Sequence, residues 1–178
     1  IPSHLLEPKI KNRSRIHYQM ANIEASQWKG KNNWALLLDP DGFIAEGTGD
    51  NIFFVKNGVV CTPEPRNILV GISRDYIFEL CEQLGIACIE KNLDTYDAYT
   101  SDESFMTATP FCLLPVTRFN CNKIGDGKIG RITQQLHDQW SSNLGVNIFQ
   151  QIRDYSKECK NLNKDQPTPY VFKSSNDD

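Results

Sequence analysis

A basic run near the start of this 178-residue chain, Lys9-Ile-Lys-Asn-Arg-Ser-Arg15, contains the first group that could do chemistry. A lysine amine that has lost its proton is a nucleophile and forms a Schiff base with a carbonyl carbon. A run of like charges is more often a solvated face. The run alone therefore leaves both interpretations open.

A second segment, Ile44 to Phe53, places Glu46 at the end of an expected strand and follows it with Gly-Thr-Gly. Small residues at such a point allow a ligand to approach the backbone closely. A tight turn with an exposed glutamate would give the same pattern. The segment is therefore a candidate binding site for a polar ligand atom.

Two further segments could bind phosphate. Gly71 stands just before an expected helix start, where free backbone N–H groups and the helix dipole favour an anion. Met106-Thr-Ala-Thr-Pro110 offers hydroxyl and N–H groups at a strand end. An ordinary helix cap and an ordinary strand-to-loop turn are the alternatives for these two segments.

The elements that must position these groups follow from hydrophobic spacing and from turn residues. Helices are expected at 15–28, 71–84, 93–99 and 129–154, with Gly145 as a candidate break in the last. Strands are expected at 34–39, 43–46, 51–56, 59–62, 86–89, 103–107 and 114–118, with Asn57-Gly58 as a hairpin turn. This order predicts an α+β fold with a mostly antiparallel or mixed sheet flanked by helices.

Apolar and small positions in the first expected helix are spaced for packing on one face. They are Ile16, Met20, Ala21, Ile23 and Ala25. We therefore expect that face of the helix to be buried.

Composition narrows the function classes. The net charge of −3 argues against nucleic acid as a partner, and no apolar run reaches the roughly 20 residues that a membrane helix needs. The six cysteines form no C-x-x-C pair, which favours free thiols in a reducing, cytoplasmic compartment and no metal site. No G-x-G-x-x-G or P-loop pattern is present.

Together the four segments resemble the fold-type IV pyridoxal-phosphate enzymes, which include branched-chain aminotransferases, D-amino acid aminotransferases and aminodeoxychorismate lyases. The family pattern is Lys, a helix ending in Glu-Ala, E-G-x-x-x-N-[ILV]-F, G-I-x-R, and T-x(5)-P-V. Its parts are matched in order by Lys11, Glu24-Ala25, Glu46 to Phe53, Gly71 to Arg74, and Thr109 to Val116. The resemblance spans roughly Lys9 to Leu136.

The resemblance implies the large domain of a D-amino acid aminotransferase-like fold and pyridoxal 5'-phosphate as the cofactor. It implies that Lys11 forms the Schiff base and then moves a proton as general base and acid. Glu46 would face the pyridine nitrogen and keep it protonated, so that the ring acts as an electron sink.

The resemblance also implies contacts with the rest of the cofactor. The expected phosphate-binding residues are Gly71, Ile72, Ser73, Ala108 and Thr109. Arg15 stands where branched-chain enzymes have a tyrosine and the lyase branch has an arginine. We expect Arg15 to contact the cofactor or the active site.

The domain organisation follows from the same resemblance. Residues 1–160 correspond to the C-terminal cofactor-binding domain, and 161–178 are expected to be a polar, disordered tail. The family's small N-terminal domain is not represented, so we expect a fragment that is poorly active alone. The family also implies a homodimer.

The leading hypothesis is transfer of an amino group from a branched-chain or D-amino acid to a 2-oxo acid. An apolar stretch, Phe111-Cys-Leu113, favours an apolar substrate side chain. One alternative is release of pyruvate by a lyase of the aminodeoxychorismate type. Another is an inactive fragment that keeps only the fold.

Overall fold

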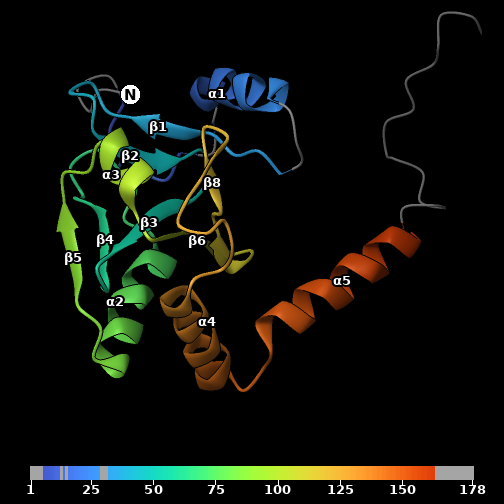
Figure 1. The fold of residues 1–178 in the computed structure, drawn as a ribbon. Helices are drawn as coiled ribbons and strands as arrows, with labels where there is room; N and C mark the ends of the chain where they lie inside the picture. Colours follow the sequence, from blue (N-terminus) through green and yellow to red (C-terminus); the bar gives the residue numbers. More distant parts are fainter. Residues whose placement is uncertain (1–5, 13, 15, 29–31, 163–178) are drawn as a thin grey trace, which may run out of the picture.

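A five-stranded mixed sheet lies at the centre of the computed structural model, which describes residues 6–12, 14, 16–28 and 32–162 (Figure 1). Its strands, in spatial order, are β5 (Cys88–Lys91), β4 (Val59–Pro63), β3 (Asn51–Lys56), β6 (Glu103–Ala108) and β7 (Cys112–Pro115). Only β4 and β5 pair in parallel, and the other neighbours are antiparallel. The predicted α+β class with a mixed sheet is confirmed.

The tight turn between β3 and β4 is the predicted hairpin. Asn57 and Gly58 have φ values of 50° and 81°. A type I′ turn requires positive φ at both central residues, which asparagine and glycine adopt most readily. Lys56 therefore pairs with Val59, and this turn sets the register of the two strands.

Both faces of the sheet are buried, because alternate residues of β3 belong to different cores. Phe53 and Val55 pack with α2 (Ile72–Leu84) and α4 (Arg131–Leu144). Ile52 and Phe54 pack on the opposite face, with α3 (Thr95–Thr100) and the two-stranded sheet of β1 (Leu36–Leu38) and β2 (Ile44–Gly47). A short hairpin of β8 (Arg118–Phe119) and β9 (Asn122–Lys123) completes the strands of the described part.

Two glycines end helices where expected. Gly85 and Gly145 adopt left-handed conformations with φ of 64° and 67°, which glycine tolerates without a steric penalty. Gly145 splits the expected 129–154 helix into α4 and α5 (Ile148–Leu162), and α5 projects away from the sheet (Figure 1). The part of the predicted tail beyond 162 lies outside the described residues.

β3 has its predicted bounds and the other predicted strands differ from theirs, with whole-strand shifts in β5 and β7. β5 begins at Cys88, two residues after the predicted start at 86, and β7 covers Cys112–Pro115 instead of 114–118. Pairing with β6 already begins at Cys112, opposite Ala108, and β7 ends at Pro115. The prediction for β7 was therefore placed too late.

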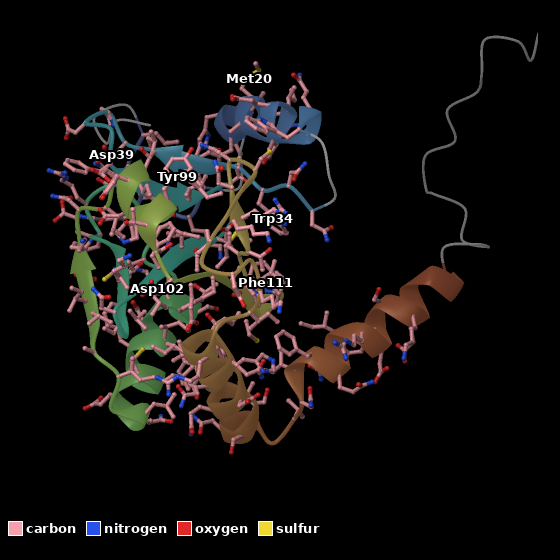
Figure 2. All side chains as sticks on the ribbon, in the orientation of Figure 1. Met20, Trp34, Asp39, Tyr99, Asp102 and Phe111 are labelled. Atoms are coloured by element: carbon pink, nitrogen blue, oxygen red, sulfur yellow. The ribbon has the colours of Figure 1, made fainter. Side chains whose placement is uncertain are left out.

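The first helix, α1 (Ile16–Gln27), forms as predicted, but the prediction that its apolar face is buried is wrong. Ile16 is 80% exposed and Met20 is 72% exposed, and Met20 points outward in Figure 2. Residues one helical turn apart share a face. Tyr18 and Asn22 form the face that meets β2 and the turn after it, so the apolar side points outward.

The structure also bears on membrane-spanning helices and on the state of the cysteines. Across the described ranges, no helix is both long and apolar enough to cross a membrane. The described cysteine side chains are free thiols, namely Cys61, Cys81, Cys88, Cys112 and Cys121.

The fold also yields a stability prediction at the start of α4. The Glu103 carboxylate on β6 accepts hydrogen bonds from the backbone N–H groups of Ile132 and Thr133, at 3.0 and 2.8 Å. Glu103→Ala leaves these helix-start donors without that partner and should lower the free energy of unfolding by roughly 1–3 kcal/mol. Urea denaturation measures this loss. The exposed Glu79 on α2 supplies the control: a comparable loss in Glu79→Ala would contradict the capping role.

Candidate active site

A cavity of about 380 Å³ opens between the segment that precedes α1, the end of β2, the start of α2 and the end of β6. Its volume lies within the range typical of small-molecule sites. It is lined by predicted site residues from all four segments: Lys11, Glu46, Gly71, Ile72, Ser73, Ala108 and Thr109. Arg15, the remaining predicted residue, lies outside the described residues.

Glu46 places a buried carboxylate in this cavity. Its residue is 7% exposed. The Tyr18 hydroxyl donates to its Oε1 at 3.0 Å, and the Leu69 N–H donates to its Oε2 at 2.9 Å. A buried carboxylate needs such donors, because burial without them would cost several kcal/mol. Two carboxylate oxygens offer about four acceptor positions, so a ligand N–H can also be accepted.

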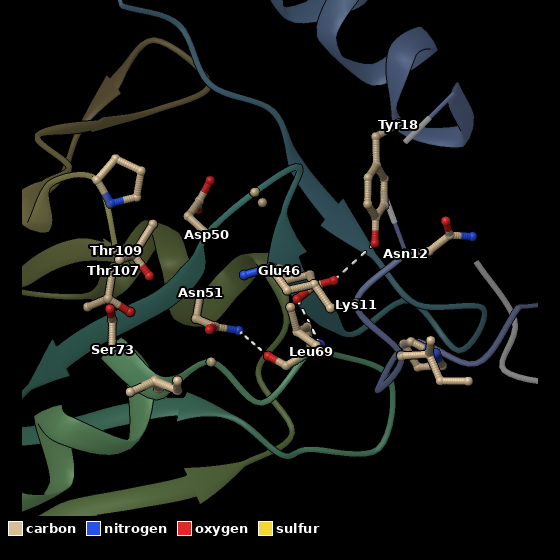
Figure 3. Close-up of a pocket in the computed structure, with 18 of the residues that line it drawn as sticks. Lys11, Asn12, Tyr18, Glu46, Asp50, Asn51, Leu69, Ser73, Thr107 and Thr109 are labelled. Atoms are coloured by element: carbon tan, nitrogen blue, oxygen red, sulfur yellow. Dashed lines mark hydrogen bonds between the residues drawn. The ribbon is translucent and has the colours of Figure 1, made fainter. Parts of the chain in front are cut away.

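Both backbone polar groups of Leu69 bind side chains of the Glu46–Phe53 segment. The Leu69 N–H binds Glu46, and the Leu69 carbonyl accepts from Asn51 Nδ2 at 2.8 Å (Figure 3). Glu46 and Asn51 are the two polar residues specified in E-G-x-x-x-N. The motif therefore fixes the chain just before α2 as well as lining the cavity.

Two glycines permit close approaches around this arrangement. A Cβ at Gly71 would lie 2.5 Å from Asn51 Oδ1, and a Cβ at Gly47 would lie 2.3 Å from Asp50 Oδ1. Distances this short require one of the partners to move. Gly71 thus allows the start of α2 to lie directly against the Asn51 side chain.

The start of α2 has the properties of an anion site. The first backbone N–H groups of a helix have no partner within the helix, and here no side chain caps them. Gly71, Ile72 and Ser73 bring these groups to the cavity wall. The positive end of the helix dipole adds attraction for a phosphate group.

Three hydroxyl-bearing residues, Ser73, Thr107 and Thr109, gather on one side of the cavity, with Lys11 and Asn12 on the other side in Figure 3. Thr107 is 1% exposed, and its Oγ1 has no hydrogen-bond partner among the described residues. A buried hydroxyl is normally satisfied. A ligand with acceptor oxygens would supply the partner that Thr107 lacks.

Lys11 lines the cavity from the segment that leads into α1, and its side chain is exposed. The amine is therefore open to a ligand that enters from solvent. Lys9, the other lysine of the basic run, is not among the lining residues. The choice of Lys11 over Lys9 agrees with this placement.

The loop residues expected to influence the substrate are turned into the protein instead. Thr109 and Pro110 line the cavity, but Leu113 is 1% exposed within the core, and the Phe111 ring meets Trp34 edge to face at 5.8 Å. Leu113 and Phe111 therefore contribute to packing and do not line the cavity. The expectation of an apolar substrate side chain stays a prediction.

Arg74, the arginine of G-I-x-R, is a structural residue. It is 2% exposed, and its guanidinium binds Glu90 at 2.6 Å and the Pro63 carbonyl at 3.1 Å. These contacts attach α2 to β4 and β5. Arg74 thereby holds the start of α2 in place without lining the cavity.

Sequence reasoning missed Tyr18 and the contact of Asn51 with the Leu69 carbonyl. It proposed the Met106–Pro110 segment but did not single out Thr107 within it. Thr107 could have been found, because residues two apart on a strand share a face and Thr109 was already a candidate. Asn51 pairs with Thr107 across β3 and β6. Tyr18 had no comparable signal, since its contact depends on how α1 is turned.

The fold and this cavity define a class of protein. The family model for amino-transferase class IV matches residues 1–119. This covers more than half of the 178-residue chain. The chain belongs to the class IV aminotransferase family.

Individual relatives agree with this assignment. A curated relative from Methanocaldococcus jannaschii, whose name places it with the branched-chain-amino-acid aminotransferases, is 37% identical over 153 residues, covering 84% of this chain and 52% of its own. A branched-chain amino acid aminotransferase from Thermobaculum terrenum, solved in its PLP form, superposes with a TM-score of 0.76 at 34% identity, over 82% of this chain and 48% of its own. A branched-chain amino acid aminotransferase from T.th., solved with pyridoxamine 5'-phosphate, gives a TM-score of 0.74 at 30% identity, over 79% and 47%. The chain thus spans about half the length of these relatives.

The close approach at Gly71 predicts a specific effect of adding one methyl group. Gly71 has φ of −81°, which alanine adopts freely, so Gly71→Ala acts through its contact with Asn51 alone. We expect a loss of roughly 1–3 kcal/mol in the free energy of unfolding, from overpacking. Thermal or urea unfolding measures it.

Asn51→Ala provides the partner variant for this test. It removes the contacted oxygen, so the double variant Gly71→Ala/Asn51→Ala should lose less stability than the sum of the two single losses. Fully additive losses would show that the two residues do not interact in this way.

Proposed function

We propose that this chain forms the pyridoxal-phosphate-binding part of an enzyme that transfers an amino group from a branched-chain amino acid to a 2-oxo acid. The observation that carries the proposal is the convergence of Lys11, Glu46, the start of α2 and Thr109 on one cavity. Each group suits a different part of one molecule: an aldehyde, a ring nitrogen and a phosphate. The Thr107 hydroxyl, buried without a partner in the described part of the chain, supports an oxygen-rich ligand at the phosphate end.

The cofactor would supply an aldehyde that condenses reversibly with amines and a ring that withdraws electrons from the substrate α-carbon. Lys11 is the amine of this chain for that condensation. Lys11 Nζ would serve as general base for the proton of the substrate α-carbon and, as general acid, would deliver that proton to the cofactor C4′. Its open position at the cavity allows both roles.

Glu46 and the start of α2 hold the two ends of the cofactor. The Glu46 carboxylate would accept a hydrogen bond from the protonated ring nitrogen and favour the protonated ring through its charge. Phosphate oxygens would accept from the N–H groups of Ile72 and Ser73 and from the hydroxyls of Ser73, Thr107 and Thr109. Glu46 and the helix start would thus bind different ends of one ligand.

The names of the relatives favour a branched-chain donor over a D-amino acid. The lyase alternative rests on Arg15, which lies outside the described residues. The inactive-fragment alternative predicts a chain that folds without retaining the cofactor, which the experiment below distinguishes. A homodimer and a cytoplasmic location stay predictions from the family and the composition.

Lys11→Ala tests the proposed anchor. Pyridoxal phosphate added to the 178-residue chain should give an absorbance band that survives dialysis, and Lys11→Ala should abolish the dialysis-resistant band. With branched-chain donors and 2-oxoglutarate, any amino transfer should fall roughly 100-fold or more, as expected when a general base is removed.

Lys9→Ala is the matched control, since Lys9 belongs to the same basic run but does not line the cavity. Retention of the dialysis-resistant band by Lys11→Ala, or its loss in Lys9→Ala, would contradict the assignment of Lys11. Release of pyruvate from aminodeoxychorismate without amino transfer would favour the lyase alternative.

Thr107→Val predicts opposite effects on stability and on binding. The near-isosteric change removes a buried hydroxyl that has no partner among the described residues, so the ligand-free chain should keep or gain stability, by up to about 1–3 kcal/mol. The affinity for pyridoxal phosphate should fall roughly tenfold, because one charge-assisted hydrogen bond is lost. Unfolding curves and equilibrium dialysis measure the two effects.

Thr62→Val is the comparison for this variant. Thr62 is equally buried, but its hydroxyl donates to the Ile52 carbonyl at 2.8 Å. Thr62→Val should therefore destabilise the chain and leave ligand affinity unchanged. Equal loss of stability in both variants would show that Thr107 already has a partner.

A further inference from the structure

The Tyr18–Glu46 hydrogen bond joins the residue proposed to face the cofactor ring to a tyrosine that the family pattern does not specify. Tyr18 Oη lies 3.0 Å from Glu46 Oε1 (Figure 3). Tyr18 is half-buried and lines the same cavity as Lys11 and Glu46. The Tyr18 hydroxyl therefore changes the electrostatic surroundings of the Glu46 carboxylate, while Glu46 stays the group that faces the ligand.

The orientation of α1 brings Tyr18 to Glu46. The helix exposes Ile16 and Met20 and directs Tyr18 and Asn22 toward β2 and the following turn. Burying two large apolar side chains would normally stabilise a helix by a few kcal/mol. In the observed orientation Tyr18 reaches Glu46 at the cavity, and Asn22 accepts a hydrogen bond from Thr48.

The hydrogen bond has a definite chemical consequence for a carboxylate next to a ring nitrogen. A proton shared between the two can reside on either one. Donors to the ionised carboxylate lower its affinity for that proton, so the proton stays on the ring. The Leu69 N–H supplies one donor and the Tyr18 hydroxyl a second, one to each carboxylate oxygen.

We propose that Tyr18 is a positioning residue that keeps Glu46 ionised and directed into the cavity, so that a bound pyridine ring retains its proton. The inference rests on the function proposed above and deepens it. Tyr18 acts only through Glu46, and without its hydroxyl the shared proton shifts toward the carboxyl group. The ring then withdraws electrons less effectively.

The experiment reads the protonation of the ring directly. Pyridoxal phosphate labelled with ¹⁵N in the ring is bound to the wild-type chain and to Tyr18→Phe, and the ring nitrogen is observed by NMR. In Tyr18→Phe the resonance should move toward the position of the unprotonated ring. In amino-transfer assays kcat should fall about tenfold with KM within about twofold, as for an interaction with the catalytic apparatus.

Tyr99→Phe is the matched control. The Tyr99 hydroxyl also makes one side-chain hydrogen bond, from Asn120 at 3.0 Å, but Tyr99 does not line the cavity. The ring-nitrogen resonance of pyridoxal phosphate bound to Tyr99→Phe should equal that in the wild type. A shift of the same size in Tyr99→Phe would overturn the inference, because it would show a general effect of losing a tyrosine hydroxyl.

A double-variant cycle tests whether Tyr18 acts through Glu46. In a Glu46→Gln background the ring has already lost its ionised partner, so adding Tyr18→Phe should leave the resonance in place. A further shift would overturn the inference. An unchanged resonance in the single Tyr18→Phe variant with bound cofactor would overturn this inference alone, whereas failure of the wild type to bind would overturn the proposed function with it.

Discussion

The rest of the candidate site depends on two hydrogen bonds to the backbone of Leu69. Glu46 accepts from its N–H and Asn51 donates to its carbonyl. Both side chains come from one short segment at the end of β2 and the start of β3. The two bonds hold the consecutive peptide groups on either side of the Leu69 Cα, so neither group can rotate without losing a hydrogen bond. The chain two residues ahead of Gly71 is thereby fixed, and with it the start of α2.

From this anchor the cavity acquires two ends of different character. Glu46 provides a buried negative charge at one end. The uncapped start of α2 and the hydroxyls of Ser73, Thr107 and Thr109 provide donors at the other. Arg74 fixes α2 from behind through Glu90 and the Pro63 carbonyl. Because the two ends differ in charge, a ligand that uses the whole cavity must carry both an acidic N–H and an anionic group.

Local sequence signals predicted most of the fold. Asn57-Gly58, Gly85 and Gly145 require special backbone conformations, and each marked a boundary correctly. The site residues were predicted because the four segments together resemble the family pattern. Each segment alone also suited an ordinary structural role. What failed was a contact between elements, the burial of the apolar face of α1. Spacing within a helix or loop shows which residues share a face, but not which neighbour that face meets.

The orientation of α1 illustrates this limit and gives it a physical reason. A helix of 12 residues that meets the body along one side can present only one face to it. Hydrophobicity alone favours Ile16 and Met20 on that side, and sequence patterning follows hydrophobicity. The Tyr18 hydroxyl instead donates to the buried Glu46 carboxylate, which would lose one of its donors without it. The partner of Tyr18 stands 28 residues further along the chain, so spacing within α1 could not show which face turns inward.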